Sequence, residues 1–536
     1  MKAISVPSCG PPEKALRKAW ADPNATFETA KVPTRSQQLQ THHMTLRDPL
    51  TEQQVINYYQ ALSDLNSDLV IDFNKTVKEE NGDRALTGAF YGYIFELTGN
   101  DSYWGVGKEA RLSGLQRSGQ LGFRKIIESP YVDFIATPYI YFLRSIGGEC
   151  SPQQPVESAR IHNKMFILED DTRTHLALPE HGYGRADTLA DSIAIMKRNF
   201  ASTLVRCLAI WWLGEKHHID PSREPAFTPL LASFQQLGTW ALQLDRSPCA
   251  EIAVLLDDES LYYETIYNDL SLPNITQQRV WGLPRIGAPF DCYLLQDFID
   301  GKVPSAKLCI FLNAFRLDDK RRKALSDELR KDGRTALWIY APGYIKDDMS
   351  VDHMEELTGI QFGKSEFPWG PLMHITDFDH PITEKLNEEL FWGTNTPLGP
   401  IFHVDDPEAT VLGEVVYSEG RCDPGFALKS FPEWNSVYIA APNIPAPVLR
   451  GIAKYAGVHL YSEDGDVLYA NKQLLAVHTI RGGKRTLRLP ESVEVVYDLF
   501  ERKIIAENTD TLKVELPKRS TSFYFTGGHA LINDLC

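Results

Sequence analysis

The sequence lacks the features that mark several common classes of protein. Its eight cysteines are scattered and form no Cys-x-x-Cys pair, so neither a zinc spacing nor a disulfide framework is predicted, and we expect no metal site or cofactor. No apolar run approaches the roughly 18 residues of a membrane span, and the N-terminus has no apolar segment typical of a signal peptide. We expect a soluble chain without a membrane partner. Its compartment stays open: cytoplasmic, or secreted if the N-terminus is truncated.

Positive charge is also scarce. Lys and Arg number 55 against 71 Asp and Glu, which gives a formal net charge of −16 at pH 7. A nucleic-acid surface needs clustered cations, so this balance argues against a nucleic-acid partner. The 536 residues exceed what one hydrophobic core holds, and 43% hydrophobic with 24% charged residues is typical of a globular protein. Several domains are therefore predicted.

The first predicted domain, residues 1–245, alternates helices with short apolar strands. Helical periodicity is clear at 51–78 and 189–204, and a further helix is predicted at 228–244. The strands are predicted at residues 84–93, 131–141, 165–169 and 205–213. Successive β–α units give parallel strands with right-handed crossovers. Four such units make half of an eight-stranded (β/α)8 barrel.

Two further domains are predicted after residue 245. Residues 246–465 restart the β–α alternation, which is typical of an open, doubly wound α/β sheet. Its strands are predicted at 251–256, 307–312, 335–340 and 436–440. Residues 466–536 instead alternate apolar and polar side chains with a period of two, which predicts a small antiparallel β-sandwich.

One carboxylate ends an apolar strand of the first domain. The run from Met165 to Leu168 stops at Glu169, and polar residues follow. Burying a carboxylate costs free energy unless it is paired or used in chemistry, and catalytic groups of a β/α barrel sit at the carboxyl ends of its strands. Glu169 is therefore a candidate catalytic residue. The alternative is a strand-terminal Glu that forms a salt bridge with Arg173.

Five other residues are candidates for binding a substrate: Tyr93, Tyr139, Arg144, Arg173 and Trp212. Arg144 and Arg173 could keep Glu169 ionised or bind hydroxyl groups, or they could form ordinary loop salt bridges. Adjacent side chains of a strand point to opposite faces, so only one of the Trp211-Trp212 pair can face a barrel interior. Trp212 could stack on a sugar ring, or it could close the barrel floor.

The order of these parts and several motifs resemble the C-terminal two-thirds of glycoside hydrolase family 42 β-galactosidases, and the resemblance covers nearly the whole chain. The resembling motifs lie at residues 14–20, 88–93, 129–139, 144–148, 164–175, 211–212, 456–461 and 465–471. The resemblance implies a partial (β/α)8 TIM barrel with strands five to eight, an amidotransferase-like α/β trimerisation domain and a small β-sandwich. It also implies a retaining glycosidase for β-galactoside-like carbohydrate, with Glu169 as the nucleophile, that forms a trimer or a dimer.

The sequence departs from that family at the acid/base residue. The family carries this Glu after an Asn at the end of barrel strand four, whereas the one Asn-Glu pair here, Asn387-Glu388, falls in the second domain, where a solvated helix is predicted. Retaining hydrolysis needs two carboxyl groups about 5 Å apart. We favour a chain that is the C-terminal part of a longer enzyme with its acid/base Glu upstream. The alternative is a non-catalytic carbohydrate-binding or assembly protein.

The second domain lacks the pattern of an active amidotransferase. That chemistry needs a Cys on a tight strand-to-helix turn, with a His partner. After the strand at 335–340 the chain reads Ala341-Pro-Gly-Tyr344, and Cys309 lies in the middle of a strand. We therefore expect a structural or subunit-contacting role for this domain.

Overall fold

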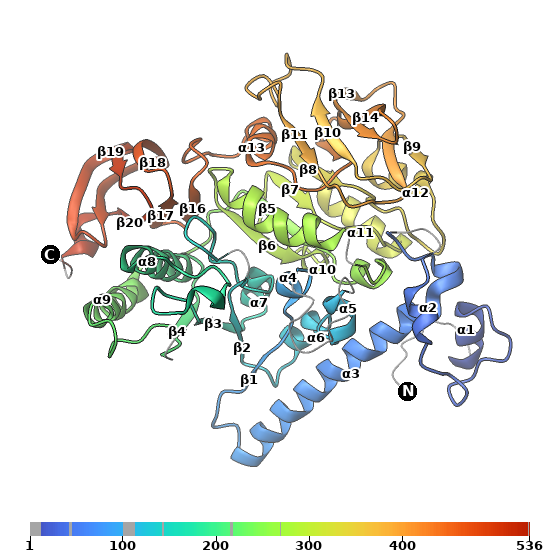
Figure 1. The fold of residues 1–536 in the computed structure, drawn as a ribbon, viewed down its shortest axis with the longest axis horizontal. Coiled ribbons are helices and arrows are strands. Elements are labelled where there is room, and N and C mark those ends of the chain that lie inside the picture. The colour runs from blue at the N-terminus through green and yellow to red at the C-terminus, as the bar shows by residue number, and fades with distance from the viewer. Residues whose placement is uncertain are drawn as a thin grey trace. The chain divides into compact units, whose positions relative to one another are not determined.

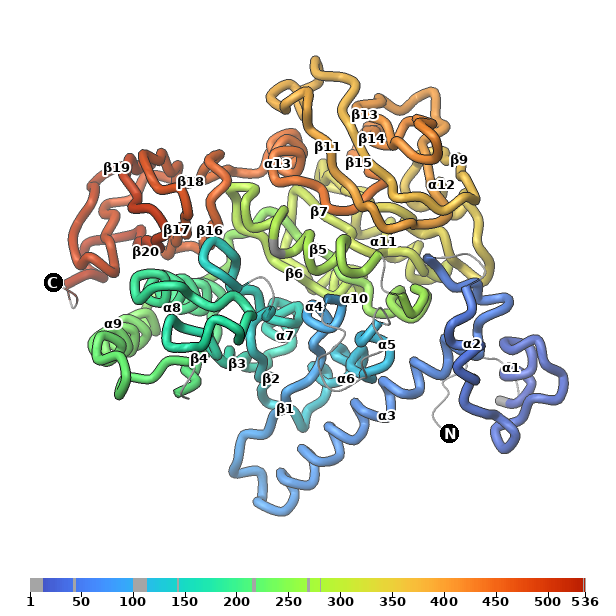
Figure 2. Tube along the Cα trace, viewed as in Figure 1, coloured from blue at the N-terminus to red at the C-terminus, as the bar shows by residue number. Residues whose placement is uncertain are grey.

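The computed structural model describes residues 12–41, 45–99, 113–141, 144–214, 218–267, 270–533 and 535 (Figures 1 and 2). Two units, each assembled from three stretches of chain, make up the structure. The first unit contains Met1–Asp133, Val254–Gln278 and Cys292–Ile444, and the second contains Phe134–Ala253, Arg279–Asp291 and Pro445–Cys536. The three-domain division expected from the sequence stays a prediction.

The N-terminal stretch of the first unit is mainly helical. Its elements are α1 (Pro12–Ala19), α2 (Arg35–Leu39), α3 (Pro49–Asn81), β1 (Gly88–Phe90), α4 (Ile94–Leu97), α5 (Gly114–Ser118) and α6 (Phe123–Glu128). The 33-residue α3 confirms the helix predicted at 51–78; the Asp48 carboxylate caps its first turn and Gly82, with φ of 65°, ends it. The strand predicted at 84–93 is much shorter than expected.

A nine-stranded sheet lies at the centre of the first unit, in the order β11-β10-β13-β14-β15-β8-β7-β5-β6. Parallel pairing joins β15 to β8 and β8 to β7, as a doubly wound sheet requires. These three strands and β5 confirm the four strands predicted for this region. The antiparallel extension from β14 to β11 was not predicted. The bounds are β5 Ile252–Leu256, β6 Phe290–Leu294, β7 Leu308–Phe311, β8 Arg334–Ile339, β10 Leu372–Ile375, β11 Phe391–Gly393, β13 Thr410–Tyr417, β14 Arg421–Ser430 and β15 Trp434–Ile439.

Smaller elements complete the first unit. The helices are α10 (Leu295–Ile299), α11 (Asp319–Leu329) and α12 (Val351–Thr358), and β9 (Phe362–Ser365) pairs with β12 (Ile401–Val404) in a separate two-stranded sheet. The helix α11 follows β7, in agreement with the β–α alternation predicted for residues 246–465.

Three parallel strands open the second unit. They are β2 (Phe134–Pro138), β3 (Met165–Asp170) and β4 (Ala209–Trp212), and each pairs with the next. The connecting helices are α7 (Val156–Ile161) and α8 (Leu189–Val205), and α9 (Phe227–Trp240) follows β4. The predicted alternation of strand and helix is therefore present here, with the predicted helices at 189–204 and 228–244 confirmed as α8 and α9.

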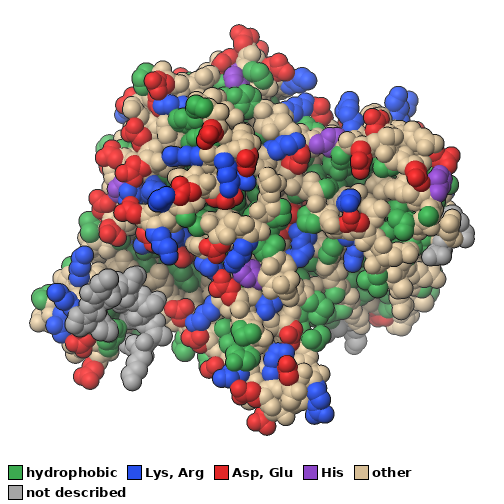
Figure 3. All heavy atoms as spheres, turned by 180° about the vertical axis from the view of Figure 1, so that it is seen from behind, with side chains coloured by type: hydrophobic (Ala, Val, Ile, Leu, Met, Phe, Trp, Pro, Cys, Tyr) green, Lys and Arg blue, Asp and Glu red, His purple; other side chains and the backbone are tan. Residues whose placement is uncertain are grey.

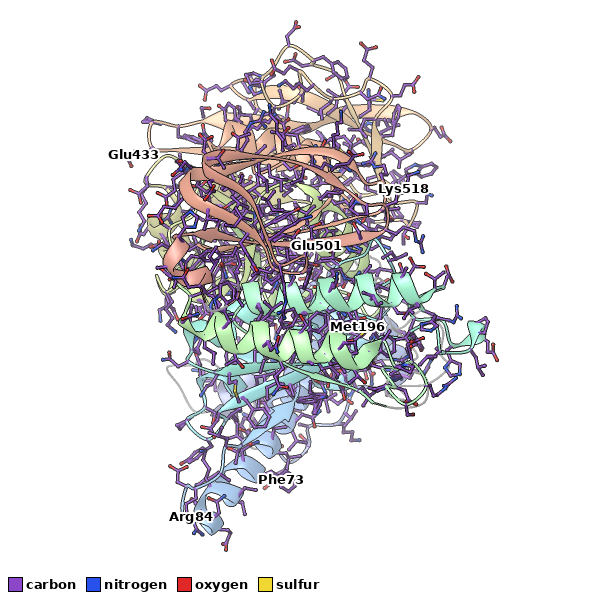
Figure 4. The ribbon with its side chains drawn as sticks, turned by 90° about the vertical axis from the view of Figure 1, so that its left-hand side faces the viewer. Phe73, Arg84, Met196, Glu433, Glu501 and Lys518 are labelled. Carbon is purple, nitrogen blue, oxygen red and sulfur yellow. The ribbon has the colours of Figure 1, made fainter. Side chains whose placement is uncertain are left out.

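The C-terminal part of the second unit is one antiparallel sheet rather than the expected two-sheet sandwich. Its strands pair in the order β16-β17-β20-β18-β19, and the register of the long β18–β19 pair shifts between Arg488 and Val493. One hydrophobic core joins this sheet to α8 and α9, which lie along it in Figure 4, where Met196 of α8 is labelled. The bounds are α13 Ala446–Tyr455, β16 Val467–Ala470, β17 Leu474–Thr479, β18 Gly483–Asp498, β19 Lys503–Leu516 and β20 Ser520–Gly527.

The surface carries charges of both signs. On the face shown in Figure 3, acidic and basic side chains are interspersed, so neither sign forms one continuous patch there. Within the described parts of the chain, we find no helix whose length and apolar character would let it span a bilayer.

Glu264 is a buried carboxyl group in the first unit, and its replacement gives a first prediction. Its side chain is 3% exposed and accepts a hydrogen bond from the Ser271 hydroxyl. Burial raises the pKa of Glu264 from 4.5 to about 8. The folded chain thus holds a proton that the unfolded chain loses, and stability falls as pH rises from about 4.5 to about 8, by up to about 1.4 kcal/mol per pH unit.

We therefore expect the free energy of unfolding of Glu264→Gln to fall less steeply with pH than that of the parent. Urea unfolding at about pH 5, 7 and 9 measures this difference. The exposed Glu388→Gln should keep the parent's slope. Equal slopes for Glu264→Gln and the parent would contradict the prediction.

Candidate active site

Glu169 lies near the carboxyl end of β3, in a row of side-by-side residues. Pro138, Glu169 and Trp211 are register partners on the three parallel strands. Alternation along β3 puts Phe166, Leu168 and Asp170 on the buried face and leaves Glu169 partly exposed on the other. The Trp211 indole N–H donates a hydrogen bond to Glu169 Oε1 at 3.4 Å. The strand therefore presents this carboxylate with an indole beside it.

Trp212 lies on the opposite side of its strand from Trp211. It is the register partner of the buried Asp170, and its ring stacks on Phe234 of α9 with a centroid distance of 5.5 Å. It packs against the core that α8 and α9 share with the C-terminal sheet. Trp212 thus has a packing role in this structure and its substrate contact stays a prediction, whereas Trp211 is the tryptophan that hydrogen-bonds to Glu169.

Asp170 anchors the end of β3 to α8. Its Oδ1 accepts hydrogen bonds from the Thr172 hydroxyl at 2.6 Å and the Thr172 N–H at 3.0 Å, and its Oδ2 accepts one from Asn199 Nδ2 at 2.8 Å. Because the Thr172 hydroxyl proton goes to Asp170, the Tyr139 hydroxyl donates to Thr172 Oγ1 at 2.6 Å. Burial raises the pKa of Asp170, and the bonds from Thr172 and Asn199 oppose that rise in part. This network fixes the backbone that follows Glu169.

Both candidate arginines pair with Asp171 rather than with Glu169. Arg144 Nη1 lies 2.5 Å from Asp171 Oδ1, and Arg173 Nη1 lies 2.7 Å from Asp171 Oδ2. Arg144 is fully buried; burial alone would lower its pKa, but the charge of Asp171 raises it above the ordinary value. Asp171 was not singled out in the sequence. The structure therefore corrects the expectation that these guanidinium groups hold Glu169 ionised.

A stack of arginines and aromatic rings runs from the interior to the surface. The Arg144 guanidinium lies 4.2 Å from the Tyr139 ring and 4.1 Å from the Tyr141 ring. Arg173 lies 5.7 Å from the Tyr141 ring and 5.6 Å from that of Tyr183, which is 43% exposed. Arg173 keeps 19% of its side chain accessible. At the outer end of this stack, Arg173 and Tyr183 are open to a ligand.

The other predicted substrate contacts are buried. Tyr139 is 0% exposed, and burial raises its pKa to about 12. Arg144 is 0% exposed as well, and Tyr93, which belongs to the first unit and precedes α4, is 1% exposed. A side chain without accessible surface cannot touch a ligand, so Tyr139 and Arg144 position their neighbours instead. The same burial contradicts a substrate contact by Tyr93.

The Asn387-Glu388 pair lies in turns instead of the expected helix. Leu390 N–H donates to the carbonyl of Asn387 at 3.0 Å, and the Asn387 side chain accepts from Glu389 N–H at 2.9 Å. Glu388 is exposed just before β11. The described side chains around Glu169 are carboxylates, arginines and aromatic rings. Among the described residues, the group of side chains close enough to hold one metal ion lies in the first unit.

Comparisons with known proteins identify the fold. No protein family model and no curated protein sequence matches the chain. Solved structures do match, over 96% of the chain. A β-galactosidase from Bacillus circulans sp. alkalophilus is 14% identical, with a TM-score of 0.54 over 96% of this chain and 74% of its own. The β-galactosidase from Rahnella sp. R3 is 13% identical, with a TM-score of 0.59 over 96% of this chain and 73% of its own.

A catalytic mutant of Gan42B, a GH42 β-galactosidase from G. stearothermophilus, is 12% identical, with a TM-score of 0.59 over 96% of this chain and 73% of its own. Identity at this level establishes likeness of fold only. The chain therefore has the fold of the glycoside hydrolase family 42 β-galactosidases over 96% of its length.

Proposed function

We propose that this chain is a retaining glycoside hydrolase that acts on β-galactoside-like carbohydrate, with Glu169 as the nucleophile. The position of Glu169 carries the proposal: it lies partly exposed at the carboxyl end of a parallel strand, beside Trp211, in a chain with the β-galactosidase fold. Glu169 would attack the anomeric carbon while an acid protonates the leaving oxygen. The same acid/base would then activate the water that releases the sugar from Glu169.

The acid/base residue must come from outside the end of β3. Asp170 points to the helix side, where Thr172 and Asn199 hold both of its oxygens. Asp171 is held by two guanidinium groups. Since both carboxylates are engaged in bonds that position the strand end, we propose that a carboxylic acid upstream of the chain supplies the proton.

Substrates with different leaving groups test the proposal. General-acid assistance is typically worth about 10²–10⁴-fold, and 2,4-dinitrophenolate departs with little assistance. We expect the chain to release dinitrophenol from 2,4-dinitrophenyl β-D-galactoside and to hydrolyse methyl β-D-galactoside far more slowly. Equal efficiency on both would contradict an acid/base from outside the chain. No turnover of either would contradict the hydrolase.

The engaged state of Asp170 and Asp171 also favours a second function, carbohydrate binding without hydrolysis. Calorimetry with galactose would then show binding while both galactosides stay intact. For either function, a homo-oligomer, trimer or dimer, stays a prediction. Size-exclusion chromatography with light scattering measures the oligomeric state directly.

The two neighbouring tryptophans give a matched pair of variants. Trp211→Ala removes the ring beside Glu169. We expect KM for the dinitrophenyl galactoside to rise about tenfold, because stacking of a ligand ring on an aromatic side chain contributes roughly 1–3 kcal/mol. Trp212→Ala removes a ring packed on Phe234, so we expect a loss of about 3 kcal/mol in unfolding free energy and little change in KM. The reverse assignment of effects would show that Trp212 is the substrate contact.

A further inference from the structure

Three side chains with metal-ligating atoms meet on the antiparallel part of the nine-stranded sheet. His374 on β10, Glu414 on β13 and Cys422 on β14 have ligand atoms that all lie within 4.8 Å of one another; the three strands are adjacent (Figure 1). His374 and Glu414 are register partners. Cys422 pairs with Val416, two residues beyond Glu414, and so shares its face.

The backbone around this cluster brings the strands close and aims the side chains. The β13–β14 register shifts on both sides of Gly413, immediately before Glu414. Irregularities of this kind re-aim the side chains next to them, and any Cβ at Gly413 would clash with the His374 carbonyl oxygen. On its other side, the His374 ring stacks on Phe391, its register partner on β11, with centroids 5.7 Å apart. The imidazole is thus held between Phe391 and Glu414.

The spacing of His374 and Glu414 suits a zinc ion. His374 Nε2 and Glu414 Oε2 lie 3.3 Å apart, and two ligands at about 2.0–2.1 Å from Zn²⁺ are about 3.3–3.4 Å apart at the tetrahedral angle. A thiolate ligand would lie about 3.6 Å from them. Because Cys422 is exposed, its side chain can rotate to close the remaining distance of about 1 Å.

The donor set also selects the ion. Magnesium and calcium take oxygen ligands, whereas imidazole, carboxylate and thiolate together favour Zn²⁺. The neighbouring cation does not compete for the site, because Arg421 lies 3.2 Å from Asp423 and over the Tyr417 ring. His374 is 25% and Glu414 36% exposed, so an ion can reach them from solvent.

We infer that His374, Glu414 and Cys422 form a Zn²⁺ site with three protein ligands and a water molecule at the fourth position. On binding, the Cys422 thiol releases its proton to solvent, and neutral His374 and ionised Glu414 each give an electron pair to the metal. The site consists of first-unit residues alone and does not depend on the proposed glycosidase activity.

Metal titration of the full chain tests the inference. Calorimetry of metal-free protein should show one Zn²⁺ bound per chain, and Co²⁺ should give a thiolate-to-metal charge-transfer band. Cys422→Ser should remove the band, and Cys422→Ser and His374→Ala should each weaken Zn²⁺ binding at least about tenfold, since even an outer partner of a ligand is worth about 10–100-fold. Cys207→Ser, which alters an exposed cysteine of the second unit, should keep the charge-transfer band and the parent's Zn²⁺ affinity.

Unchanged Zn²⁺ affinity in Cys422→Ser, an equal loss in Cys207→Ser, or the lack of a stoichiometric site in the parent would each overturn the inference. The three ligands are accessible, so the metal-free variants should unfold at the parent's temperature. Should His374→Ala unfold earlier, Glu414→Gln provides the same comparison with less change in shape.

Discussion

Glu169→Ala is expected to lower turnover of 2,4-dinitrophenyl β-D-galactoside by on the order of 10³-fold or more, because no side chain then attacks the anomeric carbon. Sodium azide is expected to restore release of dinitrophenol, since the small anion fits the space that the carboxylate leaves. Azide attacks from the side of the missing Glu169, so the product should be the α-galactosyl azide. Absorbance of dinitrophenolate and NMR of the sugar product measure the two effects.

The rescue separates a nucleophile from a residue that only supports the fold. Glu388→Ala, which removes an exposed carboxylate of the first unit, should keep the parent's rate and the parent's response to azide. A Glu169→Ala protein with the parent's rate would reject the role of Glu169. A β-galactosyl azide as the product would show that attack comes from the other face.

Asp171→Ala is expected to destabilise the second unit by about 3–5 kcal/mol, because it leaves the fully buried Arg144 charge without its counter-ion. The hydrogen bonds that remain to that guanidinium group go to the carbonyl of Tyr139, at 3.0 Å, and to the backbone carbonyl of residue 171, at 3.1 Å, and neither oxygen carries a formal charge. Urea unfolding followed by tryptophan fluorescence measures the loss.

Two further variants serve as controls for Asp171→Ala. Asp327→Ala breaks an ion pair with Lys323 that is more than half exposed on both sides, and it should cost at most about 1 kcal/mol. Adding Arg144→Met to Asp171→Ala should recover part of the stability, because it removes the unpaired charge. Similar losses in Asp171→Ala and Asp327→Ala would show that the pair with Arg144 is solvated rather than buried.

Regular elements with strong periodicity were predictable from the sequence. The capped α3 and the amphipathic α8 fall within a few residues of the predicted bounds, and β8 and β15 were visible as apolar runs. The antiparallel extension of the sheet was not predictable from the sequence. Its strands β10 and β11 span only four and three residues, and pairing with neighbouring strands determines where they form. In residues 466–536, the alternation of apolar and polar side chains does not by itself distinguish one sheet from two stacked sheets.

The candidate site was predictable only along the strand that carries it. An apolar run that ends in a carboxylate located Glu169, but the partner of Arg144 and Arg173 depends on how the loop after β3 folds back. Strand alternation showed that Trp211 and Trp212 face opposite ways without telling which faces Glu169. His374, Glu414 and Cys422 are 40 and 8 residues apart, so only the pairing of β10, β13 and β14 brings them together.

The connectivity of the two units bears on how the protein is made. The chain passes from one unit to the other after Asp133, Ala253, Gln278, Asp291 and Ile444. A unit contiguous in sequence can fold as it leaves the ribosome, N-terminal part first. Here the first unit waits for residues up to Ile444, and the second leaves the apolar sides of α8 and α9 uncovered until the last strands emerge. We therefore expect the nascent chain to expose apolar surface until late in its synthesis.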